Sequence, residues 1–244
     1  MFYKQNQSYE LDEKLFKNPT SEYRAAPFWA WNCKLNKDIL NEQIDIFKKM
    51  GFGGFHMHSR IGMSTPYLKD EFMGLIKFCT QKAEQENMLA YLYDEDRWPS
   101  GSAGGYVTKT HKYRQRYLIF SQNSREHFSL DEAINNSKDY LLAVFDVVLN
   151  EKGELKSYHT ISENDTTIGT KWYAYVHTHD ESPWHNNQTY VDTLNKEAID
   201  EFIKITYEAY QSAVGDKFNK IIPSIFTDEP QCKPKIPLSF ADST

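Results

Sequence analysis

The feature that most constrains the fold is a repeated order of short apolar strand, polar loop and amphipathic helix. A first strand is predicted over 26–31, and Asn36 can cap a helix whose apolar residues recur at helical spacing. Further strands are predicted over 53–58 and 88–93, and Thr65-Pro66 is expected to open the helix between them. Repeated strand–helix units build parallel sheets covered by helices, so the pattern predicts an α/β protein.

The helical spacing is interrupted in the middle of the chain. There the sequence predicts four strands, over 116–121, 140–149, 155–161 and 171–178, with a hairpin turn at 151–153. The strand–helix pattern then resumes with a helix capped by Asn195 and a fourth strand over 221–227. The apolar face expected for this helix consists of Ala198, Phe202, Ile205 and Ala209. We interpret the interruption as an inserted antiparallel β subdomain.

Together these elements predict the N-terminal half of a (β/α)8 TIM-like barrel. The expected segments are 1–105 with the first three barrel strands, 106–190 with the inserted subdomain, and 191–244 with the third barrel helix and fourth strand. A complete barrel needs about 250 residues without insertions. We therefore expect a truncated chain whose partner is the remaining C-terminal half of the barrel. A doubly wound open sheet is the alternative, although no Gly-rich phosphate loop follows the first strand.

Composition excludes several classes of function. The net charge is -6 with no basic cluster, which argues against a nucleic-acid partner. The cysteines, Cys33, Cys79 and Cys232, form no CxxC pair, and a reducing cytoplasm is expected. The first 16 residues contain no uninterrupted apolar run, so neither a signal peptide nor a membrane partner is expected. The aromatic share of 15% suits a surface that binds sugar rings.

The residues that follow the predicted strands are rich in carboxylates, His, Arg and Trp. In a barrel these strand ends carry the active site. Asp228 and Glu229 are neighbours in sequence, and neighbouring side chains on a strand point in opposite directions, so only one of the two can act as the main catalytic acid. Glu229 is favoured as this general acid. The alternative is that both are solvated loop acids.

Other strand-end residues are candidate ligand contacts. Trp29, Trp31 and Trp98 are expected stacking platforms for a sugar. The hydroxyl-binding or cation-binding candidates are Asn32, His56, His58, Arg60, Asp94, Glu95 and Asp96. The acidic run 94–96 could alternatively supply oxygen ligands for Ca²⁺, or form a structural ion pair with Arg97. The loop 99–105 is small enough for a ligand to approach its backbone.

The pair His56 and His58 supports a different class of protein. At i, i+2 the two side chains share one face of a strand and could bind Zn²⁺, as in a metal-dependent hydrolase of the amidohydrolase type. That type normally carries such a pair on the first strand, whereas here it lies on the second. A third possibility is a carbohydrate-binding remnant without catalysis.

Four runs of residues resemble the α-L-rhamnosidase-like glycoside hydrolases and related large bacterial proteins. These runs are 28–32, 51–60, 93–101, which includes Asp-Glu-Asp-Arg-Trp-Pro-Ser-Gly, and 226–230. The resemblance implies a TIM-like catalytic barrel followed by β-rich domains. It also implies acid catalysis by Glu229 on a glycoside or oligosaccharide and a calcium ion near the sugar hydroxyls, with no ligands assigned. The second catalytic carboxylate would come from a later strand. No other cofactor is expected.

Overall fold

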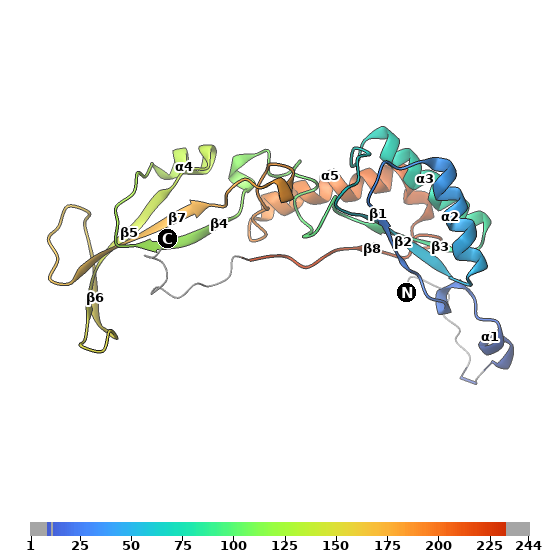
Figure 1. Ribbon diagram of the computed structural model, residues 1–244, viewed down its shortest axis with the longest axis horizontal. Helices are drawn as coiled ribbons and strands as arrows, with labels where there is room; N and C mark the ends of the chain where they lie inside the picture. The colour runs from blue at the N-terminus through green and yellow to red at the C-terminus, as the bar shows by residue number, and fades with distance from the viewer. Residues whose placement is uncertain (1–8, 11, 233–244) are drawn as a thin grey trace. The chain divides into compact units, whose positions relative to one another are not determined.

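The structure is a computed structural model that describes residues 9–10 and 12–232. Residues 1–8 and 11, which are most of the 16 residues used to predict that no signal peptide is present, lie outside the described residues. The end of the third predicted segment, 233–244, also lies outside them. The chain divides into two compact units, shown in Figure 1. The first, here the parallel unit, comprises residues up to Tyr106 together with Ile199–Pro230. The second, the antiparallel unit, comprises Val107–Ala198 and continues from Gln231.

The parallel unit contains a sheet with the order β1-β2-β3-β8, and every strand pair in it is parallel. Its elements are α1 (Glu13–Lys17), η1 (Ser21–Tyr23), β1 (Phe28–Trp31), α2 (Lys37–Lys49), β2 (Gly54–Ser59), α3 (Asp70–Gln85), β3 (Leu89–Tyr93), η4 (Gly215–Lys217) and β8 (Ile225–Phe226). The described residues form an open sheet and no closed barrel. The α/β class is therefore confirmed, at the level of a mixed protein with one parallel and one antiparallel sheet.

Helices α2 and α3 contribute the predicted apolar stripes to the core of the parallel unit. Leu40 and Ile44 of α2 are buried, as are four residues of α3, Phe72, Ile76, Cys79 and Ala83. Alternate strand residues complete this core, including Trp31, Phe55, Met57 and Leu92. The opposite face of the same strands is lined by aromatic and histidine rings.

Strands β1, β2 and β3 begin one or two residues later than predicted, and the larger differences in the parallel unit are at α3 and β8. Helix α3 begins at Asp70 instead of residue 65, because the Thr65 hydroxyl accepts a hydrogen bond from Leu35 N (2.9 Å) and holds a loop there. Strand β8 is confined to Ile225–Phe226 instead of 221–227. Pro223 lies within the predicted strand and has no N–H to donate to a sheet.

The antiparallel unit contains a sheet with the order β4-β7-β5-β6. Its elements are η2 (His111–Tyr113), β4 (Arg116–Ser121), α4 (Leu130–Asn136), β5 (Tyr140–Leu149), β6 (Leu155–Ile161), β7 (Thr170–Thr178) and η3 (Pro183–His185). Three strands have the predicted bounds, and β7 begins one residue earlier than predicted. The hairpin turn is closed by Asn150 N donating to Glu154 O (2.9 Å), with Gly153 at φ 77°. Helix α4, which begins with a Ser129–Glu132 capping box, was not predicted.

Helix α5 (Lys196–Val214) is capped as predicted, since the Asn195 side chain accepts a hydrogen bond from Glu197 N (3.0 Å). Its buried face differs in part from the predicted one. Ala198 and Phe202 are buried as expected, but further along Thr206 and Tyr210 are buried while Ile205 and Ala209 are only half-buried. A spacing of four residues keeps these buried positions on one side of the helix. Among the described residues, no helix combines the length and apolar character that crossing a membrane requires.

Candidate active site at the strand ends of the parallel unit

The ends of β3 and β8 bring two acidic segments together. Asp94 to Asp96 follow β3, and Asp228 and Glu229 follow β8, which is its parallel neighbour. The two segments are joined by a backbone hydrogen bond from Asp94 N to Phe226 O (3.2 Å). Because parallel strands end at the same edge of a sheet, residues far apart in sequence meet there.

Asp94 is fully buried and its carboxylate is occupied by hydroxyl groups of the protein. Ser100 Oγ donates to Oδ1 (2.6 Å), and Tyr207 OH donates to Oδ2 (2.7 Å). Thr227 Oγ1 also donates to Oδ2. Burial raises the pKa of Asp94, and these three hydroxyl groups act in the opposite direction. Asp94 therefore has little capacity left for the sugar hydroxyls or the cation that the sequence analysis assigned to it.

Glu95 is also buried, and its carboxylate binds backbone N–H groups. Oε1 accepts from Asp96 N (2.9 Å) and from Gly104 N. Oε2 accepts from Gly101 N, Ser102 N and Ala103 N, at 3.0, 2.8 and 2.7 Å. Burial raises the pKa of Glu95 to about 8, against the effect of the amides. The expectation that a ligand approaches the backbone of loop 99–105 is wrong for these amides, because Glu95 already occupies them.

Asp96 is buried and pairs with its neighbour in sequence. Its Oδ2 lies 3.1 Å from both Nε and an Nη atom of Arg97. This is the structural ion pair that the sequence analysis named as the alternative to ligand binding. Glu95 and Asp96 therefore order the loop that follows β3, whereas Asp94 joins that loop to α5 and β8.

Asp228 and Glu229 remain more accessible, and their pKa values move in opposite directions. Asp228 is half-buried, and Glu229 is exposed. Trp98 Nε1 donates a hydrogen bond to Glu229 Oε2 (2.9 Å), and this contact lowers the pKa of Glu229. Burial, followed by the hydrogen bond with Glu229, raises the pKa of Asp228. Of the two carboxyl groups, Asp228 therefore takes up a proton more readily and Glu229 less readily.

The three predicted tryptophan platforms lie in different environments. Trp29 is 7% exposed and donates to Gln43 Oε1 (2.7 Å), and Trp31 is 1% exposed within the core. A sugar ring has no access to either face of these indoles, so the prediction is wrong for both. The pattern Phe-Trp-Ala-Trp puts its tryptophans on one face of β1, and that face packs on the helices. Trp98 is 36% exposed and stays available.

Asn32 and Arg60 occupy the same edge of the sheet as the acidic segments. Both are exposed and follow the ends of β1 and β2, which are joined there by Arg60 N donating to Trp31 O (3.0 Å). The charge of Arg60 contributes to the electrostatic environment of Asp228, where it lowers the pKa. Both side chains can therefore contact a ligand at this edge.

His56 and His58 lie within a stack of aromatic rings. The centroid of His56 is 4.3 Å from that of Tyr91, and His58 is 3.7 Å from Tyr93. Burial lowers the pKa of His58 to about 4, so the ring is neutral near pH 7. Its Nδ1 lies 3.0 Å from Ser59 O and must donate there, because a carbonyl only accepts. In the described part of the chain, no group of three or more His, Cys, Asp or Glu could hold a metal ion.

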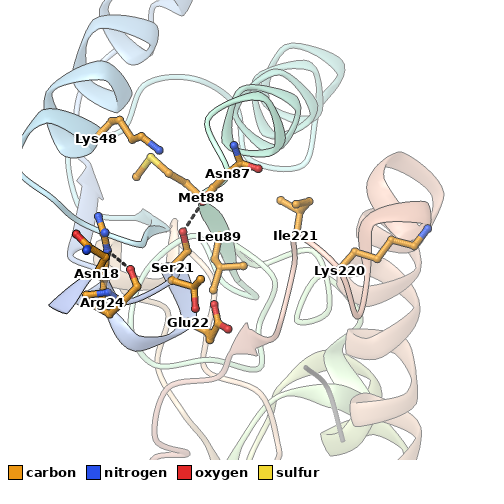
Figure 2. A pocket seen from close by; sticks show the side chains of 12 residues that line it. Asn18, Ser21, Glu22, Arg24, Lys48, Asn87, Met88, Leu89, Lys220 and Ile221 are labelled. Carbon is orange, nitrogen blue, oxygen red and sulfur yellow. Dashed lines mark hydrogen bonds between the residues drawn. The ribbon is translucent and has the colours of Figure 1, made fainter. Parts of the chain in front are cut away.

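A pocket of about 560 Å³ lies at the other end of the strands, where β3 begins (Figure 2). Lys48 and Arg24 contribute cations to it. Lys48 Nζ donates to Glu86 O at the end of α3, and Arg24 Nε donates to Pro19 O (2.6 Å). These cations therefore donate hydrogen bonds to backbone carbonyl groups near helix ends, a common arrangement at helix C-termini. None of the predicted site residues lines this pocket.

Three polar residues that belong to the site were not predicted from the sequence. Ser100, Tyr207 and Thr227 all bind the Asp94 carboxylate. Tyr207 lies half-buried on α5, and the sequence gave no signal of a polar role for it. Thr227, directly before Asp228, could have been found from its place at a strand end.

Comparisons with known proteins add only distant structural similarity. No protein-family model matches the chain, and none of the curated proteins compared with it matches. The solved structure of a rhamnosidase from Novosphingobium sp. PP1Y is similar over 59% of this chain, with a TM-score of 0.39 and 16% sequence identity. The match covers 17% of that rhamnosidase chain. A similarity this distant assigns no family to the chain.

Proposed function

We propose that this chain carries the acid-catalysis part of a glycoside hydrolase site, with Asp228 and Glu229 as its proton-carrying pair. The observation that supports this most directly is their placement. Two hydrogen-bonded carboxyl groups with opposite pKa directions lie at the strand-end edge of a parallel sheet, beside an exposed indole. Cleavage of a glycosidic bond needs a carboxylic acid that protonates the leaving oxygen.

The pair can deliver a proton in two stages. In the free site the pKa of the half-buried Asp228 is raised, so it takes up a proton more readily than Glu229, which is bonded to Trp98. A sugar ring on the exposed face of Trp98 would remove water from Glu229, and desolvation raises the pKa of a carboxyl group. The proton then passes from Asp228 to Glu229 and on to the leaving oxygen as the bond between that oxygen and the sugar carbon breaks. A water molecule bonds to that carbon and gives up a proton to the second carboxylate, which completes the hydrolysis. Asn32 and Arg60 would bind hydroxyl groups at the same edge.

The finer parts of this proposal rest on the resemblance of the strand-end motifs. We propose that the four parallel strands are half of a (β/α)8 barrel, and that a C-terminal half supplies the second carboxylate. We propose α-L-rhamnosides as the first substrates to test and the cytoplasm as the location. A calcium ion remains part of the proposal without assigned ligands.

One observation favours a second candidate, carbohydrate binding without catalysis. Glu229 is exposed and its pKa is lowered, a state that suits hydrogen bonding to sugar hydroxyls better than proton donation. The two candidates predict the same ligands and differ only in turnover.

The deciding experiment uses the 244-residue chain and a product extended beyond Thr244, assayed on aryl glycosides headed by an α-L-rhamnoside. We expect binding by both proteins and turnover by the longer one. Glu229→Gln should lower kcat by about 10²–10⁴-fold, the usual contribution of a general acid. Glu208→Gln, an exposed glutamate on α5, is the matched control and should retain activity. Binding without turnover by the longer protein would favour the second candidate, and turnover that survives Glu229→Gln would exclude Glu229 as the acid.

A further inference from the structure

We infer that Asp94 is a positioning residue that fixes the main chain of Asp228, and that it does not itself bind the ligand. The inference concerns the geometry of the site and rests on the proposed function only for its effect on turnover. It replaces the hydroxyl-binding role that the sequence analysis gave to Asp94.

One connection runs through the Ser100 hydroxyl. Asp228 N donates to Ser100 Oγ (3.0 Å), and Ser100 Oγ lies 2.6 Å from Asp94 Oδ1. Ser100 Oγ therefore accepts from Asp228 N and donates its single proton to the Asp94 carboxylate. The Asp94 carboxylate therefore sets the direction of the hydroxyl group that accepts from Asp228.

A second connection runs through the residue directly before Asp228. Thr227 Oγ1 donates to Asp94 Oδ2, and Tyr207 OH donates to the same oxygen at 2.7 Å. Tyr207 is held by α5, so this connection ties the end of β8 to a helix. Asp94 N also donates to Phe226 O (3.2 Å). Phe226 and Thr227 are thus attached to Asp94 directly, and Asp228 is attached to it through Ser100.

Because Asp94 is buried, the loss of one of its hydrogen bonds is expected to shift the segment that it holds. Asp94 is 0% exposed, so water cannot replace a lost hydroxyl partner without rearrangement. Thr227 is exposed and Asp228 is only half-buried, so the segment has few packing contacts to hold it otherwise. Its position therefore depends on the hydrogen bonds to Asp94 and Ser100.

The test compares two tyrosines on α5 in the full chain. Tyr207→Phe removes a donor to Asp94 and keeps the ring. Tyr210→Phe removes a buried hydroxyl that donates instead to Tyr93 O (2.8 Å), and serves as the matched control. We measure the hydrogen exchange rate of the Asp228 amide and the titration of the Asp228 carboxyl group by NMR. Asp94→Asn and Tyr207→Phe should speed Asp228 exchange about tenfold and shift its titration, as expected for loss of one hydrogen bond. Tyr210→Phe should leave both unchanged.

A second pair of variants separates the hydroxyl from the side-chain shape. Thr227→Val should disturb Asp228, and Thr227→Ser should restore wild-type exchange and titration. If Asp94→Asn lowers the unfolding midpoint but leaves Asp228 exchange and titration as in the wild type, the role of Asp94 is structural only and the inference is overturned. The NMR measurements require no substrate.

In a turnover assay, Tyr207→Phe should lower kcat and leave KM nearly unchanged. A wild-type protein without turnover would count against the proposed function and would leave the NMR test intact.

Discussion

The two sheets differ in where their buried acidic side chains lie and in what these side chains bind. In the parallel unit Asp94, Glu95 and Asp96 are buried together, directly after one strand end. In the antiparallel unit Asp146 is buried within β5, where it accepts hydrogen bonds from Ile168 N (2.9 Å) and Gly169 N (2.8 Å). Parallel strands all end at one edge, so their terminal side chains accumulate there. Antiparallel neighbours end at opposite edges, and an acid within such a sheet serves one local turn.

The comparison extends to the cores of the two units. The parallel unit is built around a large apolar cluster that contains Trp31, Phe55 and Phe72. The buried cluster of the antiparallel sheet contains Val144, Tyr173 and Tyr175. A large core can offset the cost of burying carboxyl groups, and the parallel unit is the one that buries most of them. This difference predicts unequal responses to substitution in the two units.

The largest expected effect comes from the core of the parallel unit. Trp31→Ala should lower the free energy of unfolding of that unit by about 3–5 kcal/mol, because it leaves a cavity at a position 1% exposed. Trp98→Ala, at a 36% exposed position of the same unit, should cost about 1 kcal/mol or less. Hydrogen exchange across both sheets checks whether the loss stays within the parallel unit. Equal losses in both sheets would show that the units unfold together and would remove the contrast between their cores.

The next effect compares the two buried acids directly. Glu95→Gln should destabilise by about 2–4 kcal/mol, because an amide NH₂ would face backbone N–H groups that now donate to a buried carboxylate. Asp146→Asn should cost about 1–2 kcal/mol, since only two backbone amides depend on it. Denaturant unfolding of both variants measures the difference. Similar costs would mean that the number of bonded amides does not govern the stability of these turns.

The third effect is a pH dependence of stability that comes from the ring stack of the parallel unit. His58 has a folded pKa of about 4, below its usual 6.5, because of burial. Between these values the unfolded chain binds more protons, so stability is full above pH 6.5 and falls as the pH drops toward 4, by about 2–3 kcal/mol. His58→Phe keeps an aromatic ring against Tyr93 and should flatten this part of the curve. Denaturation midpoints across pH 4–7 check it, and an unchanged slope in the variant would assign the acid sensitivity to other groups.

Local features of the chain were largely predictable from the sequence. The helix caps at Asn36 and Asn195, the buried stripes of α2 and α3, and the bounds of β4, β5 and β6 all appear as expected. These features depend on spacing and capping within a few residues, which the sequence displays directly. The boundaries that failed, at the start of α3 and in β8, depend on a loop contact and on an interrupted strand pairing.

What the sequence by itself determined was the order of elements and the collection of acids, histidines and tryptophans at strand ends. Only the tertiary structure decided which of these side chains are free to act. Asp94 is saturated by Tyr207 and Thr227, which lie 113 and 133 residues further along the chain. The burial of Trp29 and Trp31 likewise depends on which face of β1 meets the helices. A side chain's chemistry is set by its residue type, but its availability is set by partners that only the folded chain brings within hydrogen-bonding distance.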